Sequence, residues 1–475
     1  MSNNIAKNTT FMTAASIAQR VVSFVYFIII ARVIGVENTG DYFFALSFST
    51  IFLVIADFGL NNVLVRELAR NREQGNSYLN SLLSLKFFLG LLSYVLIILF
   101  ANILGYSEST RQLIYVAGIT VIFDSLQNLF YASLRAAEKL KYEAFGIFMS
   151  QVITMIIGTT ALLLRWPLYF LILAYTIPSF LSVFYAGYFT AKNVGWKFHP
   201  VWKKEILQPF FFMALPFFAA AIIGKLFSFS DSLLMSKILD KTQLGYWSVP
   251  YKIVFAFQFI PIALTASLYP VISALHTGEN KERIAQLLLK GWRYLLLIVM
   301  PLMFGIYAIA DNFIVSFYTV AYTPSIMVLK ILIFTLVFSY LNYTMAALLN
   351  AVNKQNEQTL LMLFALVLSI CLNLWLLPKY LVTGAAISAL LSNVILFICT
   401  LWRVRKIIFL PLRDIITLFD KCLWPSVIMT ATVVYLQNYW HFIFCIIAGV
   451  FVYTGAAFIF GGLTREDLNI KKFIL

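Results

Sequence analysis

Residues 10–35 read TFMTAASIAQRVVSFVYFIIIARVIG. This stretch is long and apolar enough to cross a bilayer as one helix, which takes about 20 residues. Arg20 nevertheless stands near its middle, where an unpaired arginine facing lipid costs at least about 2.5 kcal/mol. We therefore expect a membrane-spanning helix whose Arg20 faces protein and not lipid.

A second copy of this stretch follows 205 positions later. Arg20 falls on Lys225, and Gly40 falls on Gly245. Both copies therefore keep a cation near the centre of an apolar helix. The same offset also pairs Arg32 with Lys237 and Tyr42 with Trp247.

The repeat continues along the chain with a slowly growing offset. Lys86 matches Arg293, and Glu143 matches Glu357. Each copy holds six apolar spans, so both copies enter the membrane in the same direction. Such parallel repeats are related by an axis along the membrane normal and place a substrate site between them.

The composition is that of an integral membrane protein. Of the 475 residues, 61% are hydrophobic and only 12% are charged, whereas soluble domains carry roughly 25% charged residues. Apolar windows of about 20 residues predict an all-α polytopic membrane protein with about fourteen transmembrane helices. The windows are 12–34, 41–65, 80–104, 112–134, 143–164, 168–191, 209–236, 246–272, 287–316, 325–350, 358–377, 383–402, 420–436 and 440–461.

The spans group into three parts. Residues 1–191 form the first six-helix lobe and residues 209–402 form the second. Residues 403–475 hold two extra helices, without a counterpart in the first copy, and a tail. A short basic linker joins the two lobes.

The distribution of lysine and arginine predicts the orientation. Loops on one side, together with both termini, hold most of them, and such an excess marks the cytoplasmic side. Both termini are therefore expected in the cytoplasm. The same distribution accounts for the net charge of +15. The charge therefore does not indicate a nucleic acid as a partner. The opposite side holds only Arg32, Arg111, Arg165, Lys237, Lys241 and Lys379.

Arg20 and Lys225 are the strongest candidates for function, because they are too deep to reach the headgroups easily. One interpretation is a buried ion pair with Asp57, Asp124 or Asp231. We favour the other, a cationic central cavity that binds an anion. Those three acids either pair with the cations or carry a coupling ion, and both options stay open.

Lys86 and Arg293 lie within two turns of the predicted cytoplasmic ends of their helices. Taken alone, each is expected to extend its side chain to the headgroups. Their equivalence in the two copies instead favours a place along the cavity.

Other chemistry is not indicated. The four cysteines and three histidines lack metal-ligand spacing, so we expect no metal site. We also expect no cofactor and no catalytic residue. A membrane-embedded glycosyltransferase or ligase would need large loops with catalytic acids, and no loop here is long enough.

The motifs together resemble the Wzx-type polysaccharide flippases of the multidrug/oligosaccharidyl-lipid/polysaccharide exporter superfamily. The resemblance covers essentially the whole chain in length, helix count and motif order. The stretches that carry it are ARVIG at 31–35, GDY at 40–42, DFGL at 57–60, RELAR at 66–70, LPKY at 377–380 and GAAI at 384–387.

This resemblance implies two six-helix lobes around a V-shaped cavity that opens alternately to each side. It implies as substrate an undecaprenyl-pyrophosphate-linked (polyprenyl-pyrophosphate-linked) oligosaccharide, moved from the cytoplasmic to the periplasmic leaflet of the bacterial cytoplasmic (inner) membrane for cell-surface polysaccharide assembly. Arg20 and Lys225 would then bind the pyrophosphate. Membrane lipids, a polysaccharide polymerase and a chain-length regulator are the candidate partners.

Two alternatives stay open. The peptidoglycan lipid-precursor flippases of the same superfamily are also cationic inside, although these motifs fit them less well. A cation-coupled multidrug exporter would need acids, not Arg20 and Lys225, in the cavity.

Overall fold

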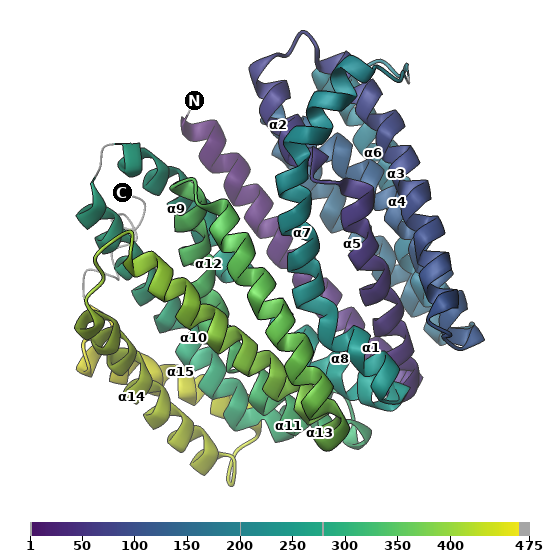
Figure 1. Ribbon diagram of the computed structural model, residues 1–475. Helices are drawn as coiled ribbons and strands as arrows, with labels where there is room; N and C mark the ends of the chain where they lie inside the picture. Colours follow the sequence, from purple (N-terminus) through teal and green to yellow (C-terminus); the bar gives the residue numbers. More distant parts are fainter. Residues whose placement is uncertain (1, 200, 278–279, 465–475) are drawn as a thin grey trace. The chain divides into compact units, whose positions relative to one another are not determined.

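A computed structural model of the chain describes residues 2–199, 201–277 and 280–464 (Figure 1). Within these residues the chain is helical and contains no strand. The elements are α1 (Ser2–Asp57), α2 (Leu60–Arg70), α3 (Gly75–Ile103), α4 (Glu108–Ala136), α5 (Leu140–Leu163), α6 (Tyr169–Val194), α7 (Lys204–Ile238), α8 (Lys241–Ala256), α9 (Phe259–Thr277), α10 (Lys281–Phe317), the 3-10 helix η1 (Val320–Tyr322), α11 (Pro324–Leu332), α12 (Thr335–Ala351), α13 (Gln355–Arg405), α14 (Leu412–Leu436) and α15 (Phe442–Ile459).

The helices confirm an all-α membrane protein with about fourteen spans. In the described residues, 11 helical segments are long and apolar enough to cross a membrane. Two of them, Phe11–Arg70 and Gln355–Arg405, contain 60 and 51 residues, and each therefore has length for two crossings. Helix α14 adds a further apolar helix of 25 residues.

Sharp bends divide the two longest helices. The backbone of α1 turns at Gly35, where φ is 77°, a left-handed conformation that glycine adopts without steric cost. Helix α13 turns at Leu381, where φ is 53°. The loops predicted between the first two spans and between the eleventh and twelfth are therefore bends and not separate connections.

Two spans predicted as continuous helices, 41–65 and 246–272, are broken. The first is interrupted at Phe58 and Gly59, which both have positive φ. The second is interrupted between α8 and α9, because Pro261 has no N–H to donate to the carbonyl of Phe257. That carbonyl accepts instead from the N–H of Ile260 at 3.3 Å and from the hydroxyl of Tyr340 at 2.7 Å.

The backbone geometry of one turn is the same in both copies of the sequence repeat. Glu138 follows α4 with φ of 59°, and Asn353 follows α12 with φ of 61°. In both turns the next lysine N–H donates back to a leucine carbonyl, Lys139 to Leu134 at 2.8 Å and Lys354 to Leu349 at 2.7 Å. The structure thus repeats its turn geometry in the copies that the sequence predicts.

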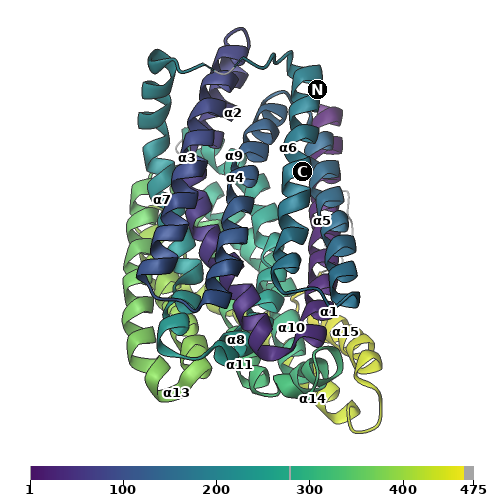
Figure 2. The same cartoon turned by 90° about the vertical axis from the view of Figure 1, so that its right-hand side faces the viewer.

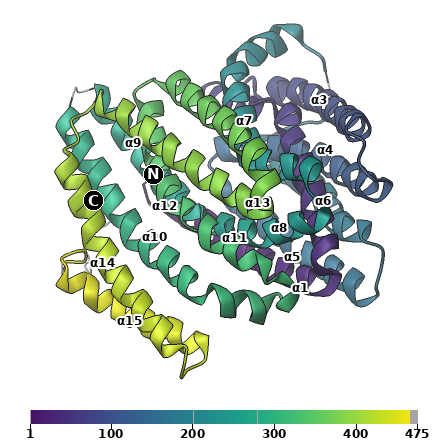
Figure 3. The same cartoon turned by 60° about the horizontal axis from the view of Figure 1, so that its bottom comes forward.

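The chain divides into two compact units, Met1–Gly245 and Tyr246–Leu475. In the first unit, α4 packs between α3 and α6, as Figure 2 shows. In the second unit, α10 packs against α14, and α14 packs against α15 (Figure 3). The two extra C-terminal helices therefore cover a helix of the second copy. The lobe limits expected at residues 191, 209 and 402 stay a prediction.

Candidate functional site

The two deep cations lie on helices of the same unit. Arg20 is on α1 and Lys225 is on α7, and these helices pack against each other. Both side chains are half-buried. The amino group of Lys225 lies 5.7 Å from the ring centroid of Phe229, a distance at which an aromatic face stabilises a cation.

Polar side chains of α1 continue along the surface that it turns towards α5. Gln19, next to Arg20, donates to the side-chain oxygen of Gln151 on α5 at 3.2 Å. About two turns after Gln19 and on the same face of α1, Tyr26 is fully buried. A methyl group on Gly158 of α5 would overlap the Tyr26 hydroxyl. A glycine on α5 therefore makes room for a buried tyrosine on α1.

Lys86 does not extend to the headgroups, so the expectation from its depth alone is wrong. Its side chain on α3 is fully buried, and its amino group lies 2.5 Å from Asp57 Oδ1. The same amino group donates to the carbonyl of Ser125 on α4 at 3.2 Å. Asp57 is the last residue of α1, immediately before the break at Phe58, and α1 packs against α3. The pair joins α1, α3 and α4, and a role for Lys86 in substrate binding stays a prediction.

Arg293, the equivalent of Lys86, has a different partner. On α10, its guanidinium Nε and Nη2 donate to the carbonyl of Gly462 at 3.2 and 3.0 Å. Gly462 follows α15, so the contact depends on helices that the first copy lacks. Substrate binding by Arg293 also stays a prediction.

The other two candidate acids lie within their helix bundles. Asp124 Oδ1 accepts from Ser179 Oγ on α6 at 2.7 Å and from Gln127 Nε2 at 2.6 Å. Asp231 on α7 is buried, with 6% of its surface exposed. Ion coupling and charge pairing both stay open for these acids. Over the described ranges, no group of three His, Cys, Asp or Glu side chains could hold a metal.

The repeated glycines Gly40 and Gly245 mark a close crossing of α1 and the start of α8. A methyl group on Gly40 would overlap the carbonyl oxygen of Lys241, and one on Gly245 would overlap that of Val36. Val36 and Lys241 are themselves separated by the repeat offset of 205. The contact is therefore reciprocal, as in a two-fold symmetric interface.

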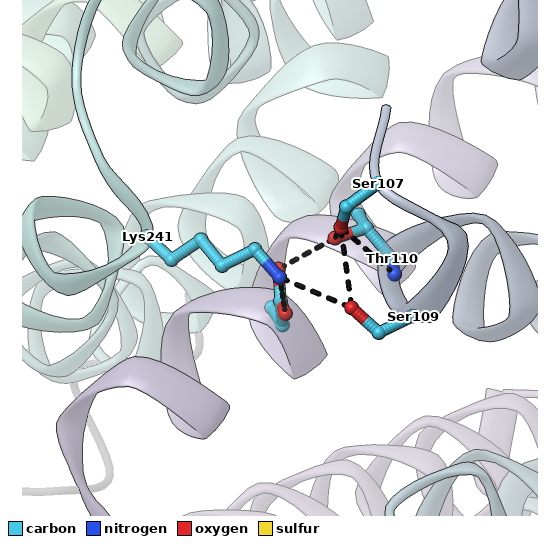
Figure 4. A network of polar contacts seen from close by, with 5 residues as sticks. Ser107, Ser109, Thr110 and Lys241 are labelled. Carbon is cyan, nitrogen blue, oxygen red and sulfur yellow. Dashed lines mark hydrogen bonds and ion pairs between the residues drawn. The ribbon is translucent and has the colours of Figure 1, made fainter. Parts of the chain in front are cut away.

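A polar network stands beside this crossing (Figure 4). The amino group of Lys241 lies 2.5 Å from Asp41 Oδ2 and 3.2 Å from Ser109 Oγ. Thr110 Oγ1 donates to the other carboxylate oxygen of Asp41 at 2.9 Å. Ser107 caps α4 by accepting from the Thr110 N–H at 3.4 Å. The network joins α1, the start of α4 and the start of α8.

The sequence alone did not identify Asp41 and Lys241 as partners. In the sequence, Lys241 is one of the loop cations of the sparsely charged side, and Asp41 is part of the motif at 40–42. The sequence offers one indication of this pair, which is that each residue lies within four positions of a repeated glycine.

A second contact joins the connection after α3 to the end of α7. The Tyr106 hydroxyl lies 3.0 Å from Ser236 Oγ, and the amino group of Lys237 lies 3.4 Å from the Tyr106 ring centroid. Burial raises the pKa of Tyr106, although its hydrogen bond with Ser236 acts in the opposite direction. Tyr106 therefore stays protonated at neutral pH.

Two family models match the chain. The model described as polysaccharide biosynthesis protein matches residues 5–276, and the model described as lipid II flippase MurJ matches residues 251–453. The first match covers more than half of the chain.

Individual proteins agree with these matches. The capsular polysaccharide biosynthesis protein CapF of Staphylococcus aureus is 21% identical over 408 residues, which are 85% of this chain and 100% of CapF. The probable low-salt glycan biosynthesis flippase Agl15 of Haloferax volcanii is 20% identical over 412 residues, 82% of this chain and 81% of Agl15.

The fold is also that of a solved flippase. A structure of lipid II flippase MurJ in an inward closed conformation aligns with a TM-score of 0.80 and 18% identity. The alignment covers 96% of this chain and 99% of the MurJ chain.

Proposed function

The chain belongs to the polysaccharide biosynthesis protein family, and from this premise we propose that it is a flippase for lipid-linked oligosaccharides. The observation that carries the proposal is the family match over residues 5–276. CapF and Agl15, both named for glycan biosynthesis, support the same substrate class. The protein is a transporter and not an enzyme, because translocation makes and breaks no covalent bond.

The substrate is a polyprenyl-pyrophosphate-linked oligosaccharide. Arg20 and Lys225 bind the pyrophosphate, because two cations at equivalent depths in two copies suit a doubly anionic group. An inside-negative potential favours outward movement of the anion by about 2.3 kcal/mol per charge per 100 mV. Asp57, Asp124 and Asp231 are not needed to drive that step.

The protein works in the bacterial cytoplasmic (inner) membrane with both termini in the cytoplasm. A polysaccharide polymerase and a chain-length regulator act with it on the other face. Alternating access requires a contact that holds the far side closed until substrate has bound. The Asp41–Lys241 pair beside the glycine crossing suits this role, because both partners lie on the sparsely charged outer side.

A second candidate function is transport of the peptidoglycan lipid precursor. It is favoured by the MurJ family match over residues 251–453 and by the likeness of fold to MurJ. Both candidates bind a prenyl pyrophosphate, so the cations alone do not separate them. The sugar part of the substrate must decide.

The test is transport in proteoliposomes. A fluorescent prenyl-pyrophosphate oligosaccharide, a peptidoglycan-precursor probe and a cationic dye are followed separately between leaflets. We expect the unchanged protein to move the first probe. Arg20→Ala or Lys225→Ala should each reduce the rate of this movement at least tenfold. Movement of the precursor alone would favour the second candidate, and efflux of the dye alone would establish a drug exporter.

Matched controls come from the repeat itself. Arg20→Lys and Lys225→Arg exchange the two cations found at the equivalent positions, so both variants should keep transport. Folded protein in the membrane is measured for every variant. Normal transport by the Arg20→Ala/Lys225→Ala double variant would refute the cationic site.

A further inference from the structure

An apolar groove opens on the first unit, away from Arg20 and Lys225. Its volume is about 640 Å³, within the range of about 300–1,000 Å³ found for ligand pockets. Leu126 and Phe130 of α4 are buried at its floor, while Phe87 of α3 and Phe184 of α6 are exposed beside it. The lining is almost wholly apolar and suits a hydrocarbon chain.

One end of the groove is closed by the chain that follows α6. Trp196 and Phe198 line it there, and the rings of Trp196 and Phe130 lie 5.0 Å apart. Lys197 stands between these two aromatic residues and is exposed. Lys192 lies one turn after Tyr188, another lining residue of α6, and is also exposed.

Hydrogen bonds fix this closing segment in place. Lys197 N–H donates to Asn76 Oδ1 at 2.9 Å, and Asn80 Nδ2 donates to the Lys197 carbonyl at 2.9 Å. Asn80 Oδ1 also accepts from Trp196 Nε1 at 3.0 Å. Asn80 is 2% exposed. The backbone of Lys197 is therefore held at both its donor and its acceptor, beside the mouth of the groove.

Charge at this end is strongly positive. Between residues 192 and 205 the chain carries four lysines and one glutamate, Glu205. The segment lies on the side to which most lysine and arginine belong, where the leaflet is anionic. An apolar groove alone does not select a lipid, because lipid tails are as apolar as the groove. Selection must therefore come from the lysines at its end.

From the groove and the lysines at its end we propose a binding site for an anionic glycerophospholipid. One acyl chain lies in the groove between α3 and α6, and the phosphate lies against Lys192 and Lys197. The site holds a resident membrane lipid and is separate from the cations that bind the transported substrate. Its test is therefore independent of the proposed function.

The experiment uses the full chain in nanodiscs that contain equal amounts of phosphatidylglycerol and phosphatidylcholine. Each lipid in turn carries a photoactivatable group on its acyl chain, and labelled peptides are identified by mass spectrometry. We expect phosphatidylglycerol to label residues 83–87 and 183–198 in preference to phosphatidylcholine. A lysine near an anionic leaflet contributes about 1 kcal/mol, or about a fivefold ratio.

Two exposed-lysine variants make the test specific. Lys192→Gln/Lys197→Gln should reduce the preference for phosphatidylglycerol by at least fivefold. Lys290→Gln/Lys406→Gln removes the same charge elsewhere on the same predicted side and should leave the preference unchanged. Gly187→Phe places a ring in the groove and should reduce labelling by both lipids.

Two results would overturn the proposal. Equal labelling by both lipids in the unchanged protein would mean that the groove holds only bulk lipid. Displacement of phosphatidylglycerol by a short-chain prenyl pyrophosphate at equal concentration would mean that the groove receives the substrate's tail.

Discussion

Lys86 and Arg293 occupy equivalent places in the two copies but have different surroundings. Lys86 is fully buried against Asp57, whereas Arg293 is half-buried and donates to the carbonyl of Gly462. The second copy has no acid at the position of Asp57, and the first copy has no counterpart of α15. Duplication thus preserves the cation, while the partner available to each copy decides what the cation does.

The largest expected effect comes from Lys86→Met. It leaves the Asp57 carboxylate without its cation. Loss of one partner of a buried pair costs about 3–5 kcal/mol, and the lower end applies here because 27% of the Asp57 side chain is exposed. Unfolding in mixed detergent and SDS micelles measures the loss. The Lys86→Met/Asp57→Asn double variant should recover most of it. If Lys86→Met alone unfolds like the unchanged protein, the pair does not support the bundle.

Substitutions at the glycine crossing should have the next largest effect on stability. Unlike substitutions of Lys86 and Arg293, they should have the same effect in both copies. Gly40→Ala and Gly245→Ala each drive a methyl group into a backbone carbonyl, and such overpacking costs about 1–3 kcal/mol. Thermal unfolding of the two variants should show similar losses. Gly455→Ala is the control, because nothing lies within 4 Å of its added methyl. A loss in only one of the two crossing variants would contradict the reciprocal contact.

Arg293→Gln should have a smaller effect than Lys86→Met. It removes two hydrogen bonds from a charged donor to Gly462, but the side chain is half-exposed, so we expect a loss of about 1.5 kcal/mol. Limited proteolysis after α15, together with unfolding in micelles, measures it. A loss as large as that of Lys86→Met would show that burial does not separate the two cations.

The smallest effect concerns a left-handed turn. Leu381 holds φ of 53°, which costs a residue with a side chain about 1 kcal/mol relative to glycine. Leu381→Gly should therefore be about 1 kcal/mol more stable than Leu381→Ala in thermal unfolding. Arg165, which also has a positive φ, of 54°, should show the same order for Gly and Ala. The reverse order at both positions would refute the shared strain.

The sequence was sufficient for the membrane class, the approximate number of spans and the duplication. These follow from hydropathy over about 20 residues and from a repeated offset, which depend on local composition. The breaks at Phe58 and between α8 and α9 were not predicted, because both lie inside apolar stretches. Only Gly59 and Pro261 indicated them.

Contacts of the candidate residues were harder to predict. Depth alone predicts Lys86 at the headgroups, and its equivalence with Arg293 predicts it along the cavity, but the sequence does not give its neighbour across the bundle. Asp57 comes within 2.5 Å of it because the end of α1 packs against α3. The Asp41–Lys241 pair likewise depends on a crossing of two helices that are 200 residues apart in sequence.

The reciprocal crossing of Gly40 and Gly245 has the form of a contact between two identical subunits. Across a two-fold axis, a residue of each subunit meets the same position of its partner. Two identical subunits that met in this way would carry the same residue at both of those positions. Because both copies belong to one chain, that position is Val36 in the first copy and Lys241 in the second. A duplicated chain can therefore carry a charge on one side of a symmetric contact and an apolar residue on the other.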